Sequence, residues 1–230
     1  MKKRMIVLSL GGSLIIPDDI NIKFLKKFKK IILNNTDKCK FVIVCGGGGI
    51  ARKYISALKE MGISEKLQSL SGISATRMNA RFMSYFFNIN PEHGIPHTIK
   101  ILKEYIRKRD VVFCGSLEYN PNQTSDSTAA GIAKKLRATF VNLSDVAGLY
   151  DKNPAENKNA NFISKISWLG FYKMAHKQKF KPGQHFILDQ TASTIIMKNK
   201  IKTYLIGKNL KEFENFLKNK KFKGTIIGED

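Results

Sequence analysis

The chain has 230 residues, of which 43% are hydrophobic and 25% are charged. This length and composition predict one packed domain and argue against an intrinsically disordered chain. Forty lysines and arginines against 18 aspartates and glutamates give a formal net charge of +22, which favours anionic substrates or polyanions. Because the lysines are spread along the chain, solvated helix faces explain most of them better than a nucleic-acid-binding patch does. The densest basic runs, at 26–30 and 218–221, are expected on amphipathic helices or at their ends.

The cysteines and the N-terminal residues indicate in which cellular compartment the protein is expected. Cys39, Cys45 and Cys114 are odd in number and show no metal-binding spacing, which favours a reducing cytoplasm. Basic residues before the apolar run at 5–10 would suit a signal peptide, but Gly11-Gly12 interrupts that run and no cleavage site follows. We therefore expect a first core strand there. The sequence contains no stretch of about 18 apolar residues, so we expect no membrane span.

Apolar runs alternate with segments of helical periodicity from end to end. In chain order we expect a strand at 5–10, a helix through 20–32, a strand at 41–45, helices at 51–61, 73–87 and 98–107, a strand at 111–114, a helix at 126–136, a strand at 139–143, a helix at 191–199, a strand at 203–206, a helix through 210–217 and a strand at 225–227. The stretch 145–161 is polar and turn-rich. This alternation predicts an α/β fold, a three-layer sandwich with a mostly parallel central sheet and helices on both faces.

Three turns after predicted strands carry candidate chemistry. In open α/β sheets, ligands bind at the carboxyl ends of the strands, so these turns should lie together. The first is Gly11-Gly12-Ser13, whose backbone can approach an anion closely and whose serine adds a hydroxyl donor. Taken alone it is a common turn.

The second turn is the run 46–49, in which four glycines leave a strand and enter a helix. Backbone N–H groups at a helix N-terminus and the helix dipole together favour an anion. Arg52 lies about one turn inside and offers a planar fork suited to phosphate. The run matches neither Gly-x-x-x-x-Gly-Lys-Ser/Thr nor Gly-x-Gly-x-x-Gly, which disfavours a P-loop NTPase and a Rossmann dehydrogenase.

The third turn is Thr124-Ser125-Asp126, where hydroxyls and one carboxylate gather at a helix start. Ser125 or Asp126 could simply cap that helix, or the cluster could contact a nucleotide and its Mg²⁺. Asp189 offers the same two interpretations, as a cap of the next helix or as a site residue. Tyr150, after another strand, could stack on a base or belong to an ordinary turn.

Taken together and in order, these residues resemble the amino-acid-kinase family over nearly the whole chain. Within that family, the strings Ala51-Arg52-Lys53-Tyr54 and Gly72-Ile73-x-x-Thr-Arg-x-Asn-Ala are similar to the archaeal-type UMP kinases. The resemblance implies a single domain at 1–230, with an acceptor side at roughly 1–125 and an ATP side at roughly 126–230. It also implies Mg²⁺-dependent transfer of a phosphoryl group from ATP to UMP, giving UDP and ADP in pyrimidine nucleotide biosynthesis. A cytoplasmic homohexamer is the assembly it implies.

The resemblance further implies a role for each matching residue. Arg52, Asp126 and Asp189 would be catalytic; ATP would be bound by Gly12, Ser13, Gly48, Arg52, Ser144, Tyr150 and Asn153, and UMP by Gly47, Ser69, Thr124 and Ser125. Mg²⁺ would arrive with ATP, and no protein ligand is assigned to it. Phosphoryl transfer needs positioning and charge neutralisation and requires no side-chain nucleophile, which agrees with these residue types.

The chain departs from the family pattern at several positions. Ser69 stands where an aspartate is usual, Ala147 and Asn153 replace two carboxylates, and the loop 116–123 is about two residues longer. Ser69 and the longer loop favour one alternative, a kinase of this family with another small phosphate or carboxylate acceptor. The lost carboxylates and the net charge favour another, a non-catalytic nucleotide- or nucleic-acid-binding protein.

Overall fold

The computed structural model of the protein describes residues 3–90, 94–121, 123–154, 156–177 and 188–229. Its centre is a seven-stranded sheet in the order β3-β2-β1-β4-β8-β9-β7. The strands are β1 (Arg4–Leu10), β2 (Cys39–Cys45), β3 (Val111–Cys114), β4 (Thr139–Leu143), β7 (Lys165–Ser167), β8 (Thr203–Ile206) and β9 (Gly224–Gly228). Every pairing is parallel except that of β8 with β9. The predicted mostly parallel sheet is confirmed, and all six predicted strands are present.

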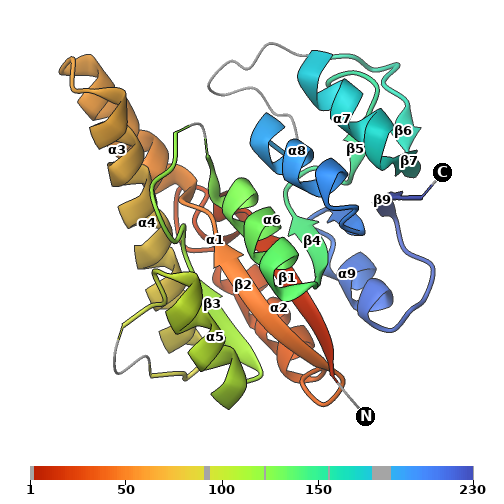
Figure 1. The fold of residues 1–230 in the computed structure, drawn as a ribbon, viewed down its shortest axis with the longest axis horizontal. Coiled ribbons are helices and arrows are strands. Elements are labelled where there is room, and N and C mark those ends of the chain that lie inside the picture. The colour runs from red at the N-terminus through yellow and green to blue at the C-terminus, as the bar shows by residue number, and fades with distance from the viewer. Residues whose placement is uncertain (1–2, 91–93, 122, 155, 178–187, 230) are drawn as a thin grey trace.

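The central strands form the core because they are apolar on both faces. The last five residues of β1 and of β2 are all buried. Near-continuous apolar runs of this kind are typical of parallel strands with helices on both sides. Helix α6 (Ser125–Leu136) packs on β1, β2 and β4, and α8 (Gln190–Lys198) packs on α6. Figure 1 shows α6 and α8 together in front of the sheet.

The other face is covered by α2 (Ile22–Leu33), α4 (Glu65–Phe86) and α9 (Leu210–Leu217). Phe28 of α2 joins them, since its ring lies 6.1 Å from those of Phe87 and Phe213. The remaining helices are α1 (Gly12–Ile15), α3 (Gly48–Glu60), α5 (Ile99–Lys108) and α7 (Trp168–Lys177). In Figure 1 the α3–α4 hairpin extends beyond the end of the sheet. None of the helices in the described ranges is long and apolar enough to cross a membrane.

Several elements differ from the sequence predictions. Helix α4 begins at Glu65, eight residues before the predicted start, because the polar stretch before Ile73 hides its periodicity. A two-stranded hairpin of β5 (Leu149–Tyr150) and β6 (Phe162–Ile163) lies within the stretch expected to be irregular. Strand β7 and helices α1 and α7 were not predicted either. Strands of two or three residues and a one-turn helix are too short to produce a periodic pattern.

Candidate active site

The two glycine-rich turns meet at the carboxyl ends of β1 and β2. A Cβ on Gly46 would lie only 2.6 Å from the backbone nitrogen of Gly12, so neither turn tolerates a side chain there. Gly48 adopts a φ of +63°, in the left-handed region that favours glycine. The glycines are therefore required by close packing as well as by any ligand. Their packing places the amides of both turns in one small region, as the sequence predicted.

Helix α4 braces these turns from the side. The Asn79 side chain donates a 2.7 Å hydrogen bond to the carbonyl of Gly46. Thr76 accepts one of 2.9 Å from the backbone nitrogen of Ser116, and Arg77 donates to the carbonyls of Ser116 and Leu117. The Thr-Arg-x-Asn string of the sequence thus connects the turn after β2 with the segment after β3. Arg77 is engaged by backbone carbonyls and acts as a structural residue here.

The hydroxyl-rich turn at the start of α6 is tied to the start of α8. Thr124 is the N-cap of α6, where its hydroxyl accepts from the Asp126 nitrogen and donates to the Asp189 carboxylate at 2.6 Å. Ser127 donates to the same carboxylate at 2.6 Å. Asp189 in turn caps α8 by accepting from the Ala192 nitrogen at 2.8 Å. Asp189 therefore caps α8 and also contacts the turn at the start of α6, while its role as a site residue stays a prediction. The cap of α6 is Thr124 and neither Ser125 nor Asp126.

Asp126 is held by two polar side chains from central strands of the sheet. Ser9 of β1 donates to Asp126 Oδ1 at 2.6 Å, and Asn142 of β4 donates to the same oxygen at 2.9 Å. Burial raises the pKa of Asp126 to about 7, with a further rise from the negative charge of Asp189, while the two hydrogen bonds oppose the shift. Two nearby carboxylates, one with a perturbed pKa, are typical of a functional site.

Sequence reasoning missed Asn142, although a signal existed. Asn142 and Ser9 are polar residues inside apolar strands, and they lie directly opposite each other in the β1–β4 pairing. Both are buried, at 2% and 1% exposure. A polar pair at the same level of two neighbouring central strands requires a hydrogen-bonding partner, and Asp126 is that partner.

The remaining predicted site residues lie at different distances from this centre. Ser144 adjoins the first turn, since its Cα lies 3.6 Å from where a Cβ on Gly11 would be. Arg52 is exposed on α3 and has no hydrogen-bond or ion-pair partner among the described residues. Ser69 is also exposed, one turn before Gly72 on α4. The carbonyl of Gly72 lies 3.7 Å from a Cβ built on Gly47, which places this part of α4 beside the second turn.

Two predicted residues lie in the segment after β4. The Tyr150 ring meets Phe162 edge to face at 5.3 Å, within the β5–β6 hairpin. Asn153 donates a 2.7 Å hydrogen bond to Glu156, in a local turn. These two contacts are local to the segment after β4, so the roles of Tyr150 and Asn153 as nucleotide-binding residues stay predictions. Ser125 is half-buried in the first turn of α6.

A mostly parallel sheet with apposed glycine turns and a hydrogen-bonded pair of carboxylates is typical of α/β proteins that bind phosphate groups and transfer them. The sequence model of the amino acid kinase family matches residues 4–207, and the chain belongs to this family. The uridylate kinase of Thermoplasma volcanium is 34% identical to it over 226 residues, which cover 97% of each protein.

Two solved structures have the same fold over almost their full length. The crystal structure of uridylate kinase from Archaeoglobus fulgidus superposes with a TM-score of 0.83 at 30% identity, covering 97% of this chain and 99% of that one. The UMP kinase of Ureaplasma parvum gives a TM-score of 0.79 at 25% identity, with both chains fully covered. The predicted α/β sandwich and the predicted family are therefore confirmed.

Proposed function

We propose that the protein is a UMP kinase, which transfers the γ-phosphoryl group of ATP to UMP and releases UDP and ADP. The observation that carries the proposal is the contact between the turns at Gly12 and Gly46–Gly48, within a family whose full-length relatives are named uridylate kinases. Gly12 and Gly48 would hold the phosphates of the donor, and Gly47 of the second turn would hold that of the acceptor. Close apposition of the two turns would place the reacting groups in line.

The donor side is assigned to Gly12, Ser13, Gly48 and Arg52. Backbone N–H groups of the first two turns would cradle the ATP phosphates, and the free guanidinium of Arg52 would neutralise charge that develops on transfer. Ser144 would continue this surface towards the nucleoside, because it lies against Gly11. Tyr150 and Asn153 complete the proposed adenosine side on the strength of the resemblance.

The acceptor side is assigned to Gly47, Ser69, Thr124 and Ser125. Gly47 lies beside α4, and Ser69 is exposed on that helix near the same turn. A serine hydroxyl can donate to or accept from the nucleoside, whereas an aspartate only accepts when ionised. This difference supports a second candidate, a kinase of this family with another small phosphate or carboxylate acceptor.

Asp126 and Asp189 are assigned to the orientation of Mg²⁺ at the donor phosphates. Magnesium is bound in such sites through one or two carboxylates plus phosphate oxygens, and the carboxylates present fit that description. Among the described residues no three His, Cys, Asp or Glu side chains converge, so phosphate oxygens would complete the coordination. When bound, Mg²⁺ would supply charge neutralisation at the transferring group; Asp126 and Asp189 would orient it, and Ser127 would fix Asp189.

The assembly is proposed to be a cytoplasmic homo-oligomer, a hexamer by resemblance, built from a single domain with acceptor and ATP sides. Apolar side chains on the α3–α4 hairpin support an interface between copies, since Met61 and Met78 are 76% and 64% exposed and Tyr54 and Tyr85 are exposed as well. Sedimentation velocity would test this directly, because a monomer at assay concentration would contradict it.

The test of the proposed activity is an acceptor panel. ADP formation is measured with ATP and Mg²⁺ and each of UMP, CMP, dTMP, AMP and GMP, by comparing kcat/KM. We expect UMP to be preferred by at least about tenfold, a difference of about 1.4 kcal/mol in transition-state binding. Preference for another acceptor would select the second candidate. No turnover with any acceptor by a folded preparation would favour the non-catalytic alternative.

A further inference from the structure

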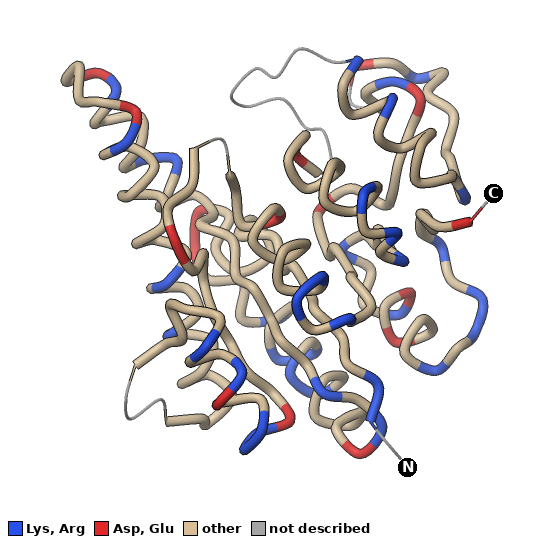
Figure 2. The backbone as a smooth tube through the Cα atoms, viewed as in Figure 1, with Lys and Arg blue, Asp and Glu red and all other residues tan. Residues whose placement is uncertain are grey.

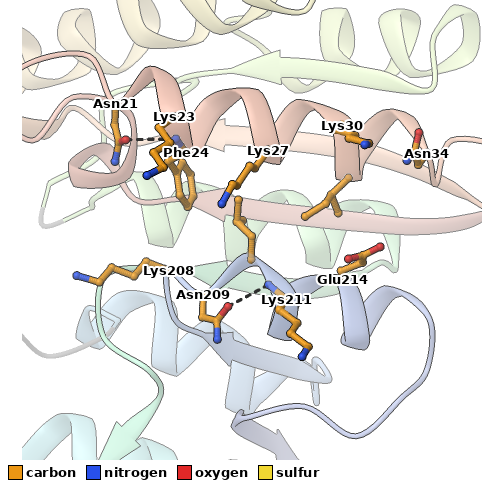
Figure 3. Close-up of a pocket in the computed structure, with 12 residues that line it drawn as sticks. Asn21, Lys23, Phe24, Lys27, Lys30, Asn34, Lys208, Asn209, Lys211 and Glu214 are labelled. Atoms are coloured by element: carbon orange, nitrogen blue, oxygen red, sulfur yellow. Dashed lines mark hydrogen bonds between the residues drawn. The ribbon is translucent and has the colours of Figure 1, made fainter.

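A basic groove lies between α2 and the start of α9, and the proposed activity does not use it. Its volume is about 640 Å³. Figure 3 shows side chains from α2 on one wall facing side chains from the β8–α9 segment on the other. The groove lysines, which face this space and are all exposed, are Lys23, Lys27, Lys30, Lys208 and Lys211.

The groove lysines are not neutralised by the protein. None of them has an ion-pair partner among the described residues. The one acidic residue on the groove wall, Glu214, is engaged by Lys218 at 2.6 Å. Figure 2 shows the wider setting, in which basic residues gather along α2 and in the connection from α9 to β9, whereas α9 itself carries one lysine and two glutamates. Net positive charge is therefore concentrated at the groove.

The position of two lysines opposes the stability of their own helices. Lys23 and Lys211 each lie in the first turn of a helix, α2 and α9, whose N-caps are Asn21 and Asn209. Cations are disfavoured at helix N-termini, where the macrodipole is positive, and here two such ends lie beside one groove. Residues that oppose local stability are expected at functional sites. An anionic ligand bound beside the two helix ends would interact favourably with both the lysines and the helix dipoles.

The floor of the groove is apolar and partly aromatic. Phe24 and Ile31 of α2 and Leu210 of α9 contribute to it. Phe24 is half-buried, with one face stacked on Phe28 at 6.1 Å and an interplanar angle of 8°. Lysines along a groove combined with an accessible aromatic ring are typical of surfaces that bind single-stranded nucleic acid without sequence preference.

We propose that this groove binds the phosphate backbone of single-stranded RNA, with Phe24 stacking on a base. Lysines at 23, 27 and 30 follow one face of α2, so their Cα atoms span about 10 Å at 1.5 Å per residue. That length matches two to three successive phosphates of an extended strand. The proposal is independent of the kinase assignment, because no groove lysine has been placed in the proposed active site.

The test is fluorescence anisotropy with a labelled 12-nucleotide oligoadenylate RNA, in the absence of ATP, UMP and Mg²⁺. Each lysine that neutralises a phosphate contributes about −0.7 to the slope of log K against log salt. Five contacts predict a slope of about −3.5, or roughly a 100-fold loss of affinity between 50 and 200 mM salt. A duplex of the same length is expected to bind more weakly than the single strand.

Two triple variants of equal charge separate the groove from the overall charge. K23Q/K27Q/K211Q is expected to weaken binding at least about tenfold at low salt and to reduce the slope by about 2. K100Q/K103Q/K108Q removes three exposed lysines from α5 and is expected to change affinity less than about twofold. Thermal melting of both variants serves to check that they fold. Equal losses in the two variants, or no binding at low salt, would overturn the proposal.

Competition experiments exclude other ligands of the same charge. Saturating UMP, which would occupy the proposed acceptor site, is expected to leave the RNA bound. Displacement by UMP, or undiminished binding by the groove variant, would place the RNA in the kinase site and contradict the proposal. F24A is expected to weaken RNA binding without affecting binding of inorganic polyphosphate, whereas an equal effect on both ligands would overturn the stacking role of Phe24.

Discussion

Ser127 and Asp189 join the two helices of the candidate active site, although 62 residues separate them: Ser127 Oγ donates to the Asp189 carboxylate at 2.6 Å. Ser127 also accepts a hydrogen bond from the Thr124 nitrogen, so one hydroxyl fixes the cap of α6 and the carboxylate that caps α8. Hydrogen bonds to charged groups contribute about 1.5–3 kcal/mol. The relative positions of α6 and α8 therefore depend on this contact.

The S127A variant should lose catalytic rate through this contact. We expect kcat to fall about tenfold or more, because Asp189 loses a hydrogen bond that fixes its orientation. The matched control is T128A, because among the described residues the Thr128 hydroxyl bonds only the carbonyl of Thr124, the N-cap of the same helix. Steady-state kinetics of both variants test the claim. Equal activity of S127A and wild type would show that Asp189 needs no such support.

The stability of the protein should depend on pH through Asp126. Its folded-state pKa is about 7, above the ordinary value of 3.8, so the folded protein holds a proton that the unfolded chain releases. This contribution to stability is present below pH 4 and is lost as pH rises towards 7. D126N lacks this titration. The difference in the free energy of unfolding between D126N and wild type should therefore shift by about 2 kcal/mol in favour of D126N from pH 5 to pH 8.

Urea unfolding of D126N and wild type at the two pH values measures this difference. The exposed Asp19 supplies a control, because D19N removes one carboxylate away from the sheet and should follow the wild-type pH dependence. If D126N and wild type lose stability in parallel as pH rises, burial of Asp126 is not the cause. D126N should also lose catalytic activity at both pH values.

Substitution of Gly12 should disrupt both glycine turns at once. A Cβ there would lie 2.6 Å from Gly48 Cα and 2.8 Å from the Gly46 carbonyl carbon, and these backbone atoms cannot move aside independently. G12A is expected to be destabilised by about 1–3 kcal/mol and to lose ATP binding. G131A is the control, because its Cβ would meet nothing within 4 Å and alanine favours the interior of α6 by about 0.5–1 kcal/mol. The melting temperature should fall in G12A and rise in G131A. ATP titrations should show lost binding in G12A alone.

Arg52 should contribute to phosphoryl transfer more than its neighbour Lys53 does, although both are exposed cations on α3. R52A is expected to lower kcat/KM about 100-fold, because a preorganised charge at the transferring group is removed. K53A removes the same net charge one position along and should stay within about threefold of wild type. Partial recovery in R52K would separate the effect of charge from that of the planar fork. Similar losses in R52A and K53A would mean that only the local charge matters.

The sequence predicted the sheet well because its central strands are continuous apolar runs bounded by glycines or polar turns. It also predicted that the two glycine turns and the 124–126 cluster lie together, since all three follow predicted strands. It could not determine which residue caps α6, because Thr124, Ser125 and Asp126 are all acceptable caps and only their packing against Asp189 decides. Asn142 escaped notice because a single polar residue in a strand has meaning only when its neighbour across the sheet is known.

The β5–β6 hairpin marks another limit of sequence reasoning. Its strands contain two residues each and are stabilised by tertiary contacts, among them the hydrogen bond from the Leu149 nitrogen to the Thr225 hydroxyl of β9. Such an element has almost no local propensity, so it depends on a partner 76 residues away. The groove between α2 and α9 shows the same dependence, because neither helix alone indicates that the lysines of both face one space.

The assignment as a UMP kinase is tested by measuring product formation from UMP and γ-³²P-labelled ATP with Mg²⁺. Wild-type protein is expected to produce labelled UDP and unlabelled ADP in equal amounts, and R52A and D126N are expected to produce far less of both under the same conditions. Release of labelled inorganic phosphate without UDP, or the absence of any labelled UDP from a folded wild-type preparation, would contradict the assignment as a UMP kinase.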